Sequence, residues 1–269
     1  MEDDLLVVRD EGVLRVTLNR PDEGNALTPA QVAGLVTLFD DAGASLETRA
    51  VLLTGAGSTF CRGTDARVAR PRPPAPPAAP PRPVGFTAWL IRTGVQRLVA
   101  AVRACEKPVV AAVQGLAADA GLYLALACDF VVAAEDARFA VTFTQRALVP
   151  DGGGIYLLPR LVGPQRAKEI VLLGDRVPAA DALAMGLVNR VVPVASLDAT
   201  ARELAHRLAG GPTKAIGLAK ALLNRSLDSD FAAAFHDEAV AQEIALGTVD
   251  AAESFAARGE GRPPSYVGW

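Results

Sequence analysis

The feature that most constrains the fold of this chain is a repeated order of apolar runs, glycine-bearing loops and helical patterns. Residues 50–54, 108–113 and 130–134 have the length and branched composition of buried strands. A helical pattern over residues 121–128 separates the last two runs. Strands that alternate with helices favour a layered α/β fold, because each helix packs on the sheet that it connects.

The N-terminal part predicts a hairpin followed by a helix. Residues 5–8 and 13–18 are rich in branched side chains, and the turn residues 10–12 separate them. Thr28 and Pro29 then supply a helix N-cap and a proline at the first helical position.

After about residue 201 the sequence predicts helices alone. Residues 212–227 and 231–246 have helical periodicity with broad apolar faces. Such faces at a chain end cover either their own core or another subunit, which favours an oligomer. We expect a core over residues 1–200 and a C-terminal helical oligomerisation region over residues 201–269.

Composition limits the classes of partner. The chain has 269 residues, is 51% hydrophobic and carries a formal net charge of -3, which gives no basic footprint for nucleic acid. The acidic N-terminus and the lack of long apolar runs argue against a secretory signal and a membrane span, so we expect a cytoplasmic protein. Cys61, Cys105 and Cys128 lie far apart, which indicates neither a disulfide framework nor a zinc site.

A proline-rich segment over residues 70–83 interrupts this order. Its composition favours an extended polyproline conformation on the surface. We interpret it as a loop beside Thr64 and Asp65, and a ligand for a proline-recognising partner is the alternative.

Asp151 is the strongest candidate for chemistry. It stands between Pro150 and three glycines, at residues 152–154, which fix or free the backbone rather than form helix. A charged side chain in such a loop is typical of a functional site. The alternative is that Asp151 caps the helix expected to begin near Ile155.

Two small-residue loops, FCRGTD at residues 60–65 and QGLAADAG at residues 114–121, each follow a predicted strand. Loops of Gly and Ala let backbone N–H groups approach a ligand, and two converging donors make an oxyanion hole. Tight packing turns are the alternative. A dinucleotide-binding fingerprint is absent, because its third glycine would fall on Phe60.

The motifs, taken in order, resemble those of the crotonase, or enoyl-CoA hydratase/isomerase, superfamily. The matching blocks are FCRGTD, KPVVAAVQGLAADAGLYLALACD, FAVTFTQRALVPDGGGIYLLPRLVG, GLVNRVV and ESFAARGEGRPPSYVG. The resemblance implies an α/β fold, namely a crotonase-like spiral of ββα repeats with a C-terminal helical trimerisation region. It also implies a homotrimer or a dimer of trimers and an acyl-CoA thioester substrate. No separate cofactor is implied, because coenzyme A is part of the substrate.

The resemblance assigns site residues as well. The backbone N–H groups of Thr64 and Ala120 would hold the thioester oxygen and stabilise an enolate. The segment of residues 64–67 would line the coenzyme A channel, with Arg67 near the phosphates. The implied substrate-binding residues are Ala26, Thr64, Asp65, Ala66, Arg67, Tyr123 and Phe143.

This sequence departs from the family pattern at the positions of the two hydratase glutamates, which correspond to Tyr123 and Phe143. Without those carboxylates, hydration by the usual route is disfavoured. The P-D-G-G context of Asp151 instead resembles isomerase-type members, especially epoxyphenylacetyl-CoA isomerases and related enoyl-CoA isomerases, in which an aspartate here acts as the base. We therefore expect an acyl-CoA isomerase that uses Asp151 for a 1,3-proton shift.

Asp119 stands where the family usually has glycine, and two roles stay open for it. It is either a second acid/base group or a residue that caps the turn. In the first case a hydratase or dehydratase could use Asp151 with Asp119. A third possibility is a non-catalytic acyl-CoA-binding protein that retained the loops and lost the glutamates.

Overall fold

The computed structural model describes residues 4–68, 76–80 and 84–269. Most of the predicted proline-rich segment, residues 70–83, lies outside these ranges. Within them, no helix is long and apolar enough to cross a bilayer.

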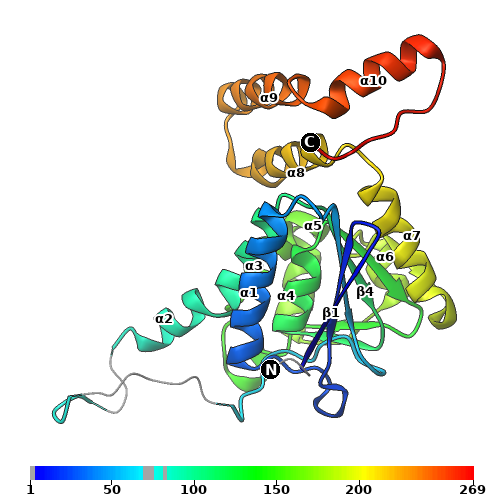
Figure 1. The fold of residues 1–269 in the computed structure, drawn as a ribbon. Helices are drawn as coiled ribbons and strands as arrows, with labels where there is room; N and C mark the ends of the chain where they lie inside the picture. The colour runs from blue at the N-terminus through cyan, green and yellow to red at the C-terminus, as the bar shows by residue number, and fades with distance from the viewer. Residues whose placement is uncertain (1–3, 69–75, 81–83) are drawn as a thin grey trace.

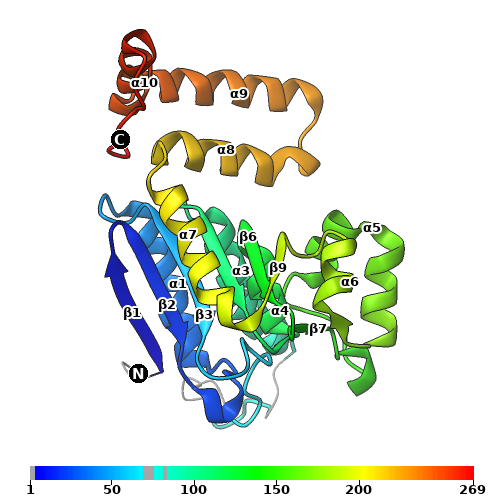
Figure 2. The same ribbon diagram turned by 90° about the vertical axis from the view of Figure 1, so that its right-hand side faces the viewer.

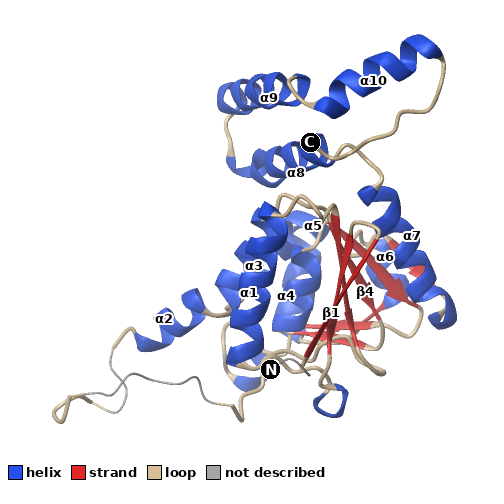
Figure 3. Ribbon diagram, viewed as in Figure 1, coloured by secondary structure: helices blue, strands red, loops and turns tan. Residues whose placement is uncertain are grey.

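A six-stranded sheet forms the centre of the fold, in the order β1-β2-β3-β4-β6-β9 (Figure 3). Only β1 is antiparallel to its neighbour, and the other pairs are parallel. Its strands are β1 (Leu5–Asp10), β2 (Val13–Leu18), β3 (Ala50–Gly55), β4 (Val109–Val113), β6 (Phe130–Ala134) and β9 (Arg190–Val192). The hairpin and the three buried strands predicted from the sequence are confirmed.

A second, three-stranded sheet lies beside it and contains β5 (Leu116–Ala118), β7 (Arg138–Ala140) and β8 (Val177–Pro178). These strands were not predicted, because two or three residues are too few to show the two-residue period of a strand.

Ten α-helices occur in the described part of the chain (Figure 1). They are α1 (Pro29–Ala44), α2 (Phe86–Thr93), α3 (Val95–Ala104), α4 (Ala120–Ala127), α5 (Gly154–Leu173), α6 (Ala179–Ala184), α7 (Leu197–Ala209), α8 (Thr213–Arg225), α9 (Phe231–Leu246) and α10 (Val249–Glu260). The predicted start of α1 is confirmed, since Thr28 accepts the N–H of Gln31 at 3.1 Å and Gln31 accepts the N–H of Thr28 in return.

The large sheet is covered on both faces. The helices α1, α3 and α4 pack on one face in the larger apolar core, and α7 packs on the other with Leu197, Ala201 and Leu204 (Figure 2). Every residue of α4 is buried, so this helix is the centre of the larger core. These layers produce the predicted α/β class, and they bring the N-terminus of α4 beside β5 and beside Cys61 in the loop that follows β3.

The helices α8, α9 and α10 project from this layered body (Figures 1 and 2). Buried Lys220 anchors α8, because its ammonium donates to the carbonyls of Val102 and Lys107 and pairs with Asp129 at 2.8 Å. The helix α9 buries none of its residues. The predicted boundary at residue 200 falls inside α7, and the division into two parts stays a prediction.

Candidate active site

The two small-residue loops lie against each other at the start of α4. Cys61 donates its N–H to the carbonyl of Leu116 at 3.0 Å, and Ala118 donates to the carbonyl of Cys61 at 2.9 Å. Gly121 permits this approach, because a Cβ there would overlap the Cys61 carbonyl oxygen. A Cβ built on Gly63 would lie only 3.8 Å from the Ala120 nitrogen, so residues 63 and 120 are neighbours.

The amides of Thr64 and Ala120 have no hydrogen-bond partner among the described residues. The Leu27 carbonyl accepts the N–H of Asp65 at 2.9 Å, and the Leu27 N–H donates to the carbonyl of Gly63 at 2.8 Å. In such a parallel bridge the N–H of the residue between them, Thr64, points away from Leu27. Ala120 is the first residue of α4, where an amide has no partner within the helix. Across the described residues, neither N–H donates a hydrogen bond. Two neighbouring free donors are the elements of an oxyanion hole.

Asp151 lies in the turn that precedes α5. The N-cap of α5 is Gly153, and no side chain caps the helix, so the alternative of Asp151 as a cap is not supported. Gln96 donates to the backbone carbonyl of Asp151 at 2.8 Å and holds the turn. A Cβ on Gly152 would lie 2.6 Å from the Tyr123 ring, and one on Gly154 would overlap it. The glycines therefore let the backbone beside Asp151 lie against Tyr123.

The carboxyl group of Asp151 is made more basic by its surroundings. Partial burial raises its pKa above the usual aspartate value, and the nearby charge of Asp119 raises it further. The guanidinium of Arg146 acts in the opposite direction. A carboxylate with a raised pKa is a better proton acceptor near neutral pH.

Tyr123 and Phe143 form an apolar wall beside Asp151. Their rings stack with centroids 6.2 Å apart and an interplanar angle of 20°. Both side chains are buried. Burial raises the pKa of the Tyr123 hydroxyl, and the charges of Asp119 and Asp151 add to this, so Tyr123 stays neutral at physiological pH. A general acid/base pair at these two positions is therefore absent.

Replacing Tyr123 by phenylalanine is expected to stabilise the fold. The Tyr123 hydroxyl is buried and has no hydrogen-bond partner among the described residues. An unsatisfied buried hydroxyl costs about 1–3 kcal/mol, and each 1 kcal/mol raises the Tm of a chain of this size by about 2–4 °C, so we expect the Tm to rise by at least about 2 °C. The matched control is Tyr156→Phe, because exposed Tyr156 donates its hydroxyl to Asp228 and should gain nothing. A lower Tm for Tyr123→Phe in thermal unfolding would show that the hydroxyl has a partner.

Asp65 orders the loop that follows Thr64. Arg67 binds both of its carboxylate oxygens at 2.9 Å, and Arg20 binds one at 3.1 Å. Arg67 first and Arg20 second hold the pKa of the Asp65 carboxyl well below its usual range. Arg20 also donates to the carbonyl of Ala26 at 2.6 Å, which connects this loop to the start of α1.

The predicted coenzyme A residues differ in accessibility. Thr64, Ala66 and Arg67 are exposed, whereas Ala26 and Asp65 are buried beneath them. The sequence motifs assign no role to Arg20, and no local pattern connects it to Asp65. The structure shows the reason for the contact, because a buried carboxylate requires a cation or hydrogen bonds. The contact of this segment with coenzyme A stays a prediction.

Asp119 occupies the residue position immediately before the free amide of Ala120. It has φ 50° and ψ -119°, which lies outside the left-handed helical region and costs a non-glycine residue about 1–3 kcal/mol. Its carboxylate does not cap α4. The carboxylate accepts instead from Thr142 and Arg146, neither of which the sequence analysis had included in the site.

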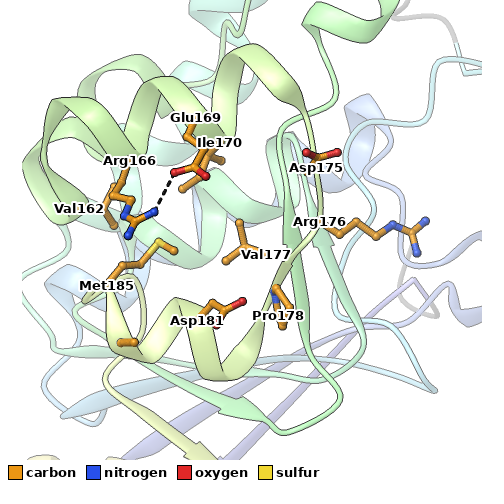
Figure 4. Close-up of a pocket in the computed structure, with 11 residues that line it drawn as sticks. Val162, Arg166, Glu169, Ile170, Asp175, Arg176, Val177, Pro178, Asp181 and Met185 are labelled. Atoms are coloured by element: carbon orange, nitrogen blue, oxygen red, sulfur yellow. Dashed lines mark hydrogen bonds and ion pairs between the residues drawn. The ribbon is translucent and has the colours of Figure 1, made fainter.

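A separate pocket of about 450 Å³ lies between the second half of α5 and α6 (Figure 4). Its lining combines apolar side chains with the ion pair of Arg166 and Glu169 and with exposed Asp175. None of the site residues predicted from the sequence lines this pocket.

Comparison with known proteins defines the class to which this fold and site belong. Residues 8–268 match the family described as enoyl-CoA hydratase/isomerase, and the chain therefore belongs to this family, the crotonase family. The predicted crotonase-like fold is confirmed by a TM-score of 0.89 to the crystal structure of an enoyl-CoA hydratase from Bacillus anthracis. That structure is 33% identical, with 99% of this chain and 100% of that chain covered.

Individual relatives carry names from different reaction classes. The chain is 35% identical over 259 residues to the 1,2-epoxyphenylacetyl-CoA isomerase of Escherichia coli strain K12, with 96% of each chain covered. It is 34% identical over 221 residues to a carnitinyl-CoA dehydratase of Salmonella typhi, with 82% of this chain and 80% of the relative covered. The family thus supports hydratase or isomerase chemistry on acyl-CoA without separating the two.

Proposed function

We propose that the protein is an acyl-CoA isomerase that moves a double bond through an enolate and a 1,3-proton shift. The observation that carries this proposal is the combination of two amides without a hydrogen-bond partner among the described residues, those of Thr64 and Ala120, with one partly buried carboxylate of raised pKa at Asp151. The substrate would be an enoyl-CoA or a related acyl-CoA thioester. Membership of the enoyl-CoA hydratase/isomerase family supports the thioester class.

The proton shift needs only groups of this chain. The thioester oxygen accepts hydrogen bonds from Thr64 and Ala120, and Asp151 removes a proton from the α-carbon of a 3-enoyl thioester. The negative charge is delocalised into the enolate, where the two donors stabilise it by about 3–4 kcal/mol each. Protonated Asp151 then returns the proton to the γ-carbon, which yields the 2-enoyl thioester and regenerates the carboxylate.

Two observations favour isomerisation over hydration. The side chains at the positions of the hydratase glutamates are a buried tyrosine and a phenylalanine, which cannot activate water. The Asp119 carboxylate accepts three hydrogen bonds from Thr142 and Arg146, which leaves little capacity to hold a catalytic water. A hydratase or dehydratase that uses Asp151 with Asp119 is the second candidate, because the charges of these two carboxylates interact.

The direct test is product analysis with purified protein. A panel of short, long and aromatic 3-enoyl-CoA thioesters should yield 2-enoyl products of unchanged mass in mass spectrometry. Reactions run in ¹⁸O-labelled water should leave the product unlabelled. Incorporation of the label would support the second candidate, and binding of thioesters without any turnover would support a non-catalytic protein.

The pH profile of isomerisation should report the basicity of Asp151. The carboxylate is the active form, so kcat/KM should fall as the pH decreases through the pKa of Asp151. Because burial raises that pKa, we expect this acid limb above the ordinary aspartate value of about 3.9. Arg146→Gln should move the limb to higher pH, since the Arg146 charge lowers the pKa of Asp151. If the acid limb stays at the same pH in Arg146→Gln, the charge of Arg146 does not affect the pKa of the catalytic base.

The C-terminal helices support assembly as a homotrimer or a dimer of trimers. Large apolar side chains are exposed on α8, α9 and α10, and α9 buries nothing within the chain. The main examples are Leu223, Phe231, Phe235, Val240, Ile244 and Phe255. Light scattering should give a mass of three or six chains of 27.9 kDa. A monomer at micromolar concentration would contradict this assignment.

A further inference from the structure

Asp119 has an unusual backbone conformation, and its side chain stabilises this conformation by binding residues outside α4. Its φ is 50° and its ψ is -119°, a combination that glycine adopts readily and other residues rarely adopt. Because no side chain caps α4 at this position, local capping does not explain the conformation. A residue keeps such an unfavourable conformation only where contacts with the surrounding structure fix it.

The carboxylate of Asp119 ties the start of α4 to a segment more than twenty residues away. Its Oδ1 atom accepts from the Thr142 amide at 2.7 Å. Its Oδ2 atom accepts from the Thr142 hydroxyl at 2.7 Å and from the Arg146 guanidinium at 2.8 Å. The Asp119 N–H also donates to the carbonyl of Ala140 at 3.0 Å, so both backbone and side chain bind the same segment.

The ψ angle of Asp119 sets the direction of the Ala120 N–H. Rotation about ψ turns the peptide plane between residues 119 and 120, and that plane contains this unpaired amide. The bound segment also includes Phe143, whose ring stacks on Tyr123 and lies 5.1 Å below the Arg146 guanidinium. One side chain therefore connects an oxyanion donor to the wall of the acyl site.

We infer that Asp119 is a positioning residue, which locks the Ala120 amide toward the thioester oxygen through its bonds to Thr142 and Arg146. This inference depends on the proposed function, because it assigns Ala120 as an oxyanion donor. It answers the question that the sequence left open about Asp119. The Asp119 oxygens accept three hydrogen bonds within the protein, which occupy three of the roughly four lone-pair sites of a carboxylate. This network favours a role in holding the segment over a role in proton transfer.

Three variants separate positioning from proton transfer. Asp119→Ala removes the carboxylate and keeps the unfavourable backbone angles, Asp119→Gly removes it and accepts those angles, and Thr142→Val removes one hydrogen bond. We expect kcat to fall about 100-fold for Asp119→Ala and about tenfold for the other two, with KM changed less than threefold. An acid limb of kcat/KM should persist in all three, because Asp151 remains the base. It should stay at the parent pH in Thr142→Val and move to lower pH in the two Asp119 variants, since the Asp119 charge raises the pKa of Asp151.

A spectroscopic measurement tests the inference without turnover. The infrared carbonyl stretch of a bound, ¹³C-labelled saturated acyl-CoA reports polarisation of the thioester by the two amides. The parent should lower this frequency, Asp119→Ala should largely restore the value found in solution, and Asp119→Gly should restore it in part. Asp151→Asn should leave the parent shift in place, since it removes no donor.

The outcomes distinguish the inference from the proposed function. Parent-like kcat and carbonyl frequency in both Asp119→Gly and Thr142→Val would overturn the positioning role. Loss of one limb of the pH profile in Asp119→Gly would overturn it in favour of proton transfer. If the parent polarises the thioester and isomerises nothing, the proposed function fails, while the frequencies of the variants still decide the role of Asp119.

Discussion

Replacing Asp151 by asparagine should lower kcat for isomerisation by about 10³-fold, with only a small change in KM. The asparagine preserves the size of the side chain and removes the only group that we assign to proton transfer, and a positioned general base contributes about 10²–10⁴-fold. The two amide donors at Thr64 and Ala120 remain, so the variant should bind the thioester and polarise it. Steady-state kinetics with a 3-enoyl-CoA substrate measure both quantities.

The Tm of Asp151→Asn shows whether a loss of activity comes from the missing base or from unfolding of the variant. The pKa of Asp151 is raised in the folded state, so its contribution to stability is present below the unfolded-state pKa and is lost as the pH rises through the folded-state pKa. Asparagine does not ionise and so avoids this loss of stability at neutral pH. The Tm of Asp151→Asn at neutral pH should therefore equal or exceed that of the parent. Asp175→Asn, in the separate pocket, is the matched control and should keep full activity. Parent-like activity in Asp151→Asn would refute the mechanism.

Replacing Gly121 by alanine should reduce both stability and activity strongly. The new Cβ would overlap the carbonyl oxygen of Cys61 and lie 2.7 Å from its Cβ, and a backbone oxygen cannot move without moving its loop. Overpacking of this kind costs about 1–3 kcal/mol. Displacing residues 61–64 from α4 also separates the Thr64 and Ala120 amides, and a 1 Å error of position can cost about 100-fold in rate. We expect kcat/KM to fall by about that factor.

Gly34→Ala is the control for this substitution. Gly34 lies within α1, and its added Cβ would meet Leu5 at 3.4 Å, an ordinary van der Waals distance. Alanine should stabilise that helix by about 1 kcal/mol and leave the kinetics unchanged. If Gly121→Ala behaves like Gly34→Ala in thermal unfolding and in turnover, the two loops do not require the close approach that brings the amides together.

The order of elements could be predicted because it depends on local patterns. Branched runs of five or six residues marked the central strands, and Thr28 with Pro29 marked the start of α1. The same local chemistry identified Asp151 and the two glycine-bearing loops as candidates, since a charge among glycines needs no tertiary information to be noticed. The short strands β5, β7, β8 and β9 carried no such pattern.

The contacts that organise the site could not be predicted, because they join residues far apart in the sequence. Asp119 binds Thr142 and Arg146 at separations of 23 and 27 positions, and Arg20 binds Asp65 at 45. The Asp119 contacts depend on the packing of β7 beside β5 and on the turn after β7. A sequence pattern shows that Asp119 is unusual, but only the folded chain supplies its partners.

Transfer of a deuterium label within one substrate tests the central claim most directly. A 3-enoyl-CoA deuterated at the α-carbon would be converted in ordinary water in a single turnover, and the product would be examined by NMR. If one carboxylate carries the proton in both directions, a measurable fraction of the 2-enoyl product will hold deuterium at the γ-carbon, and Asp151→Asn will form almost none of it. A product without γ-deuterium, formed by Asp151→Asn at the parent rate, would contradict the account.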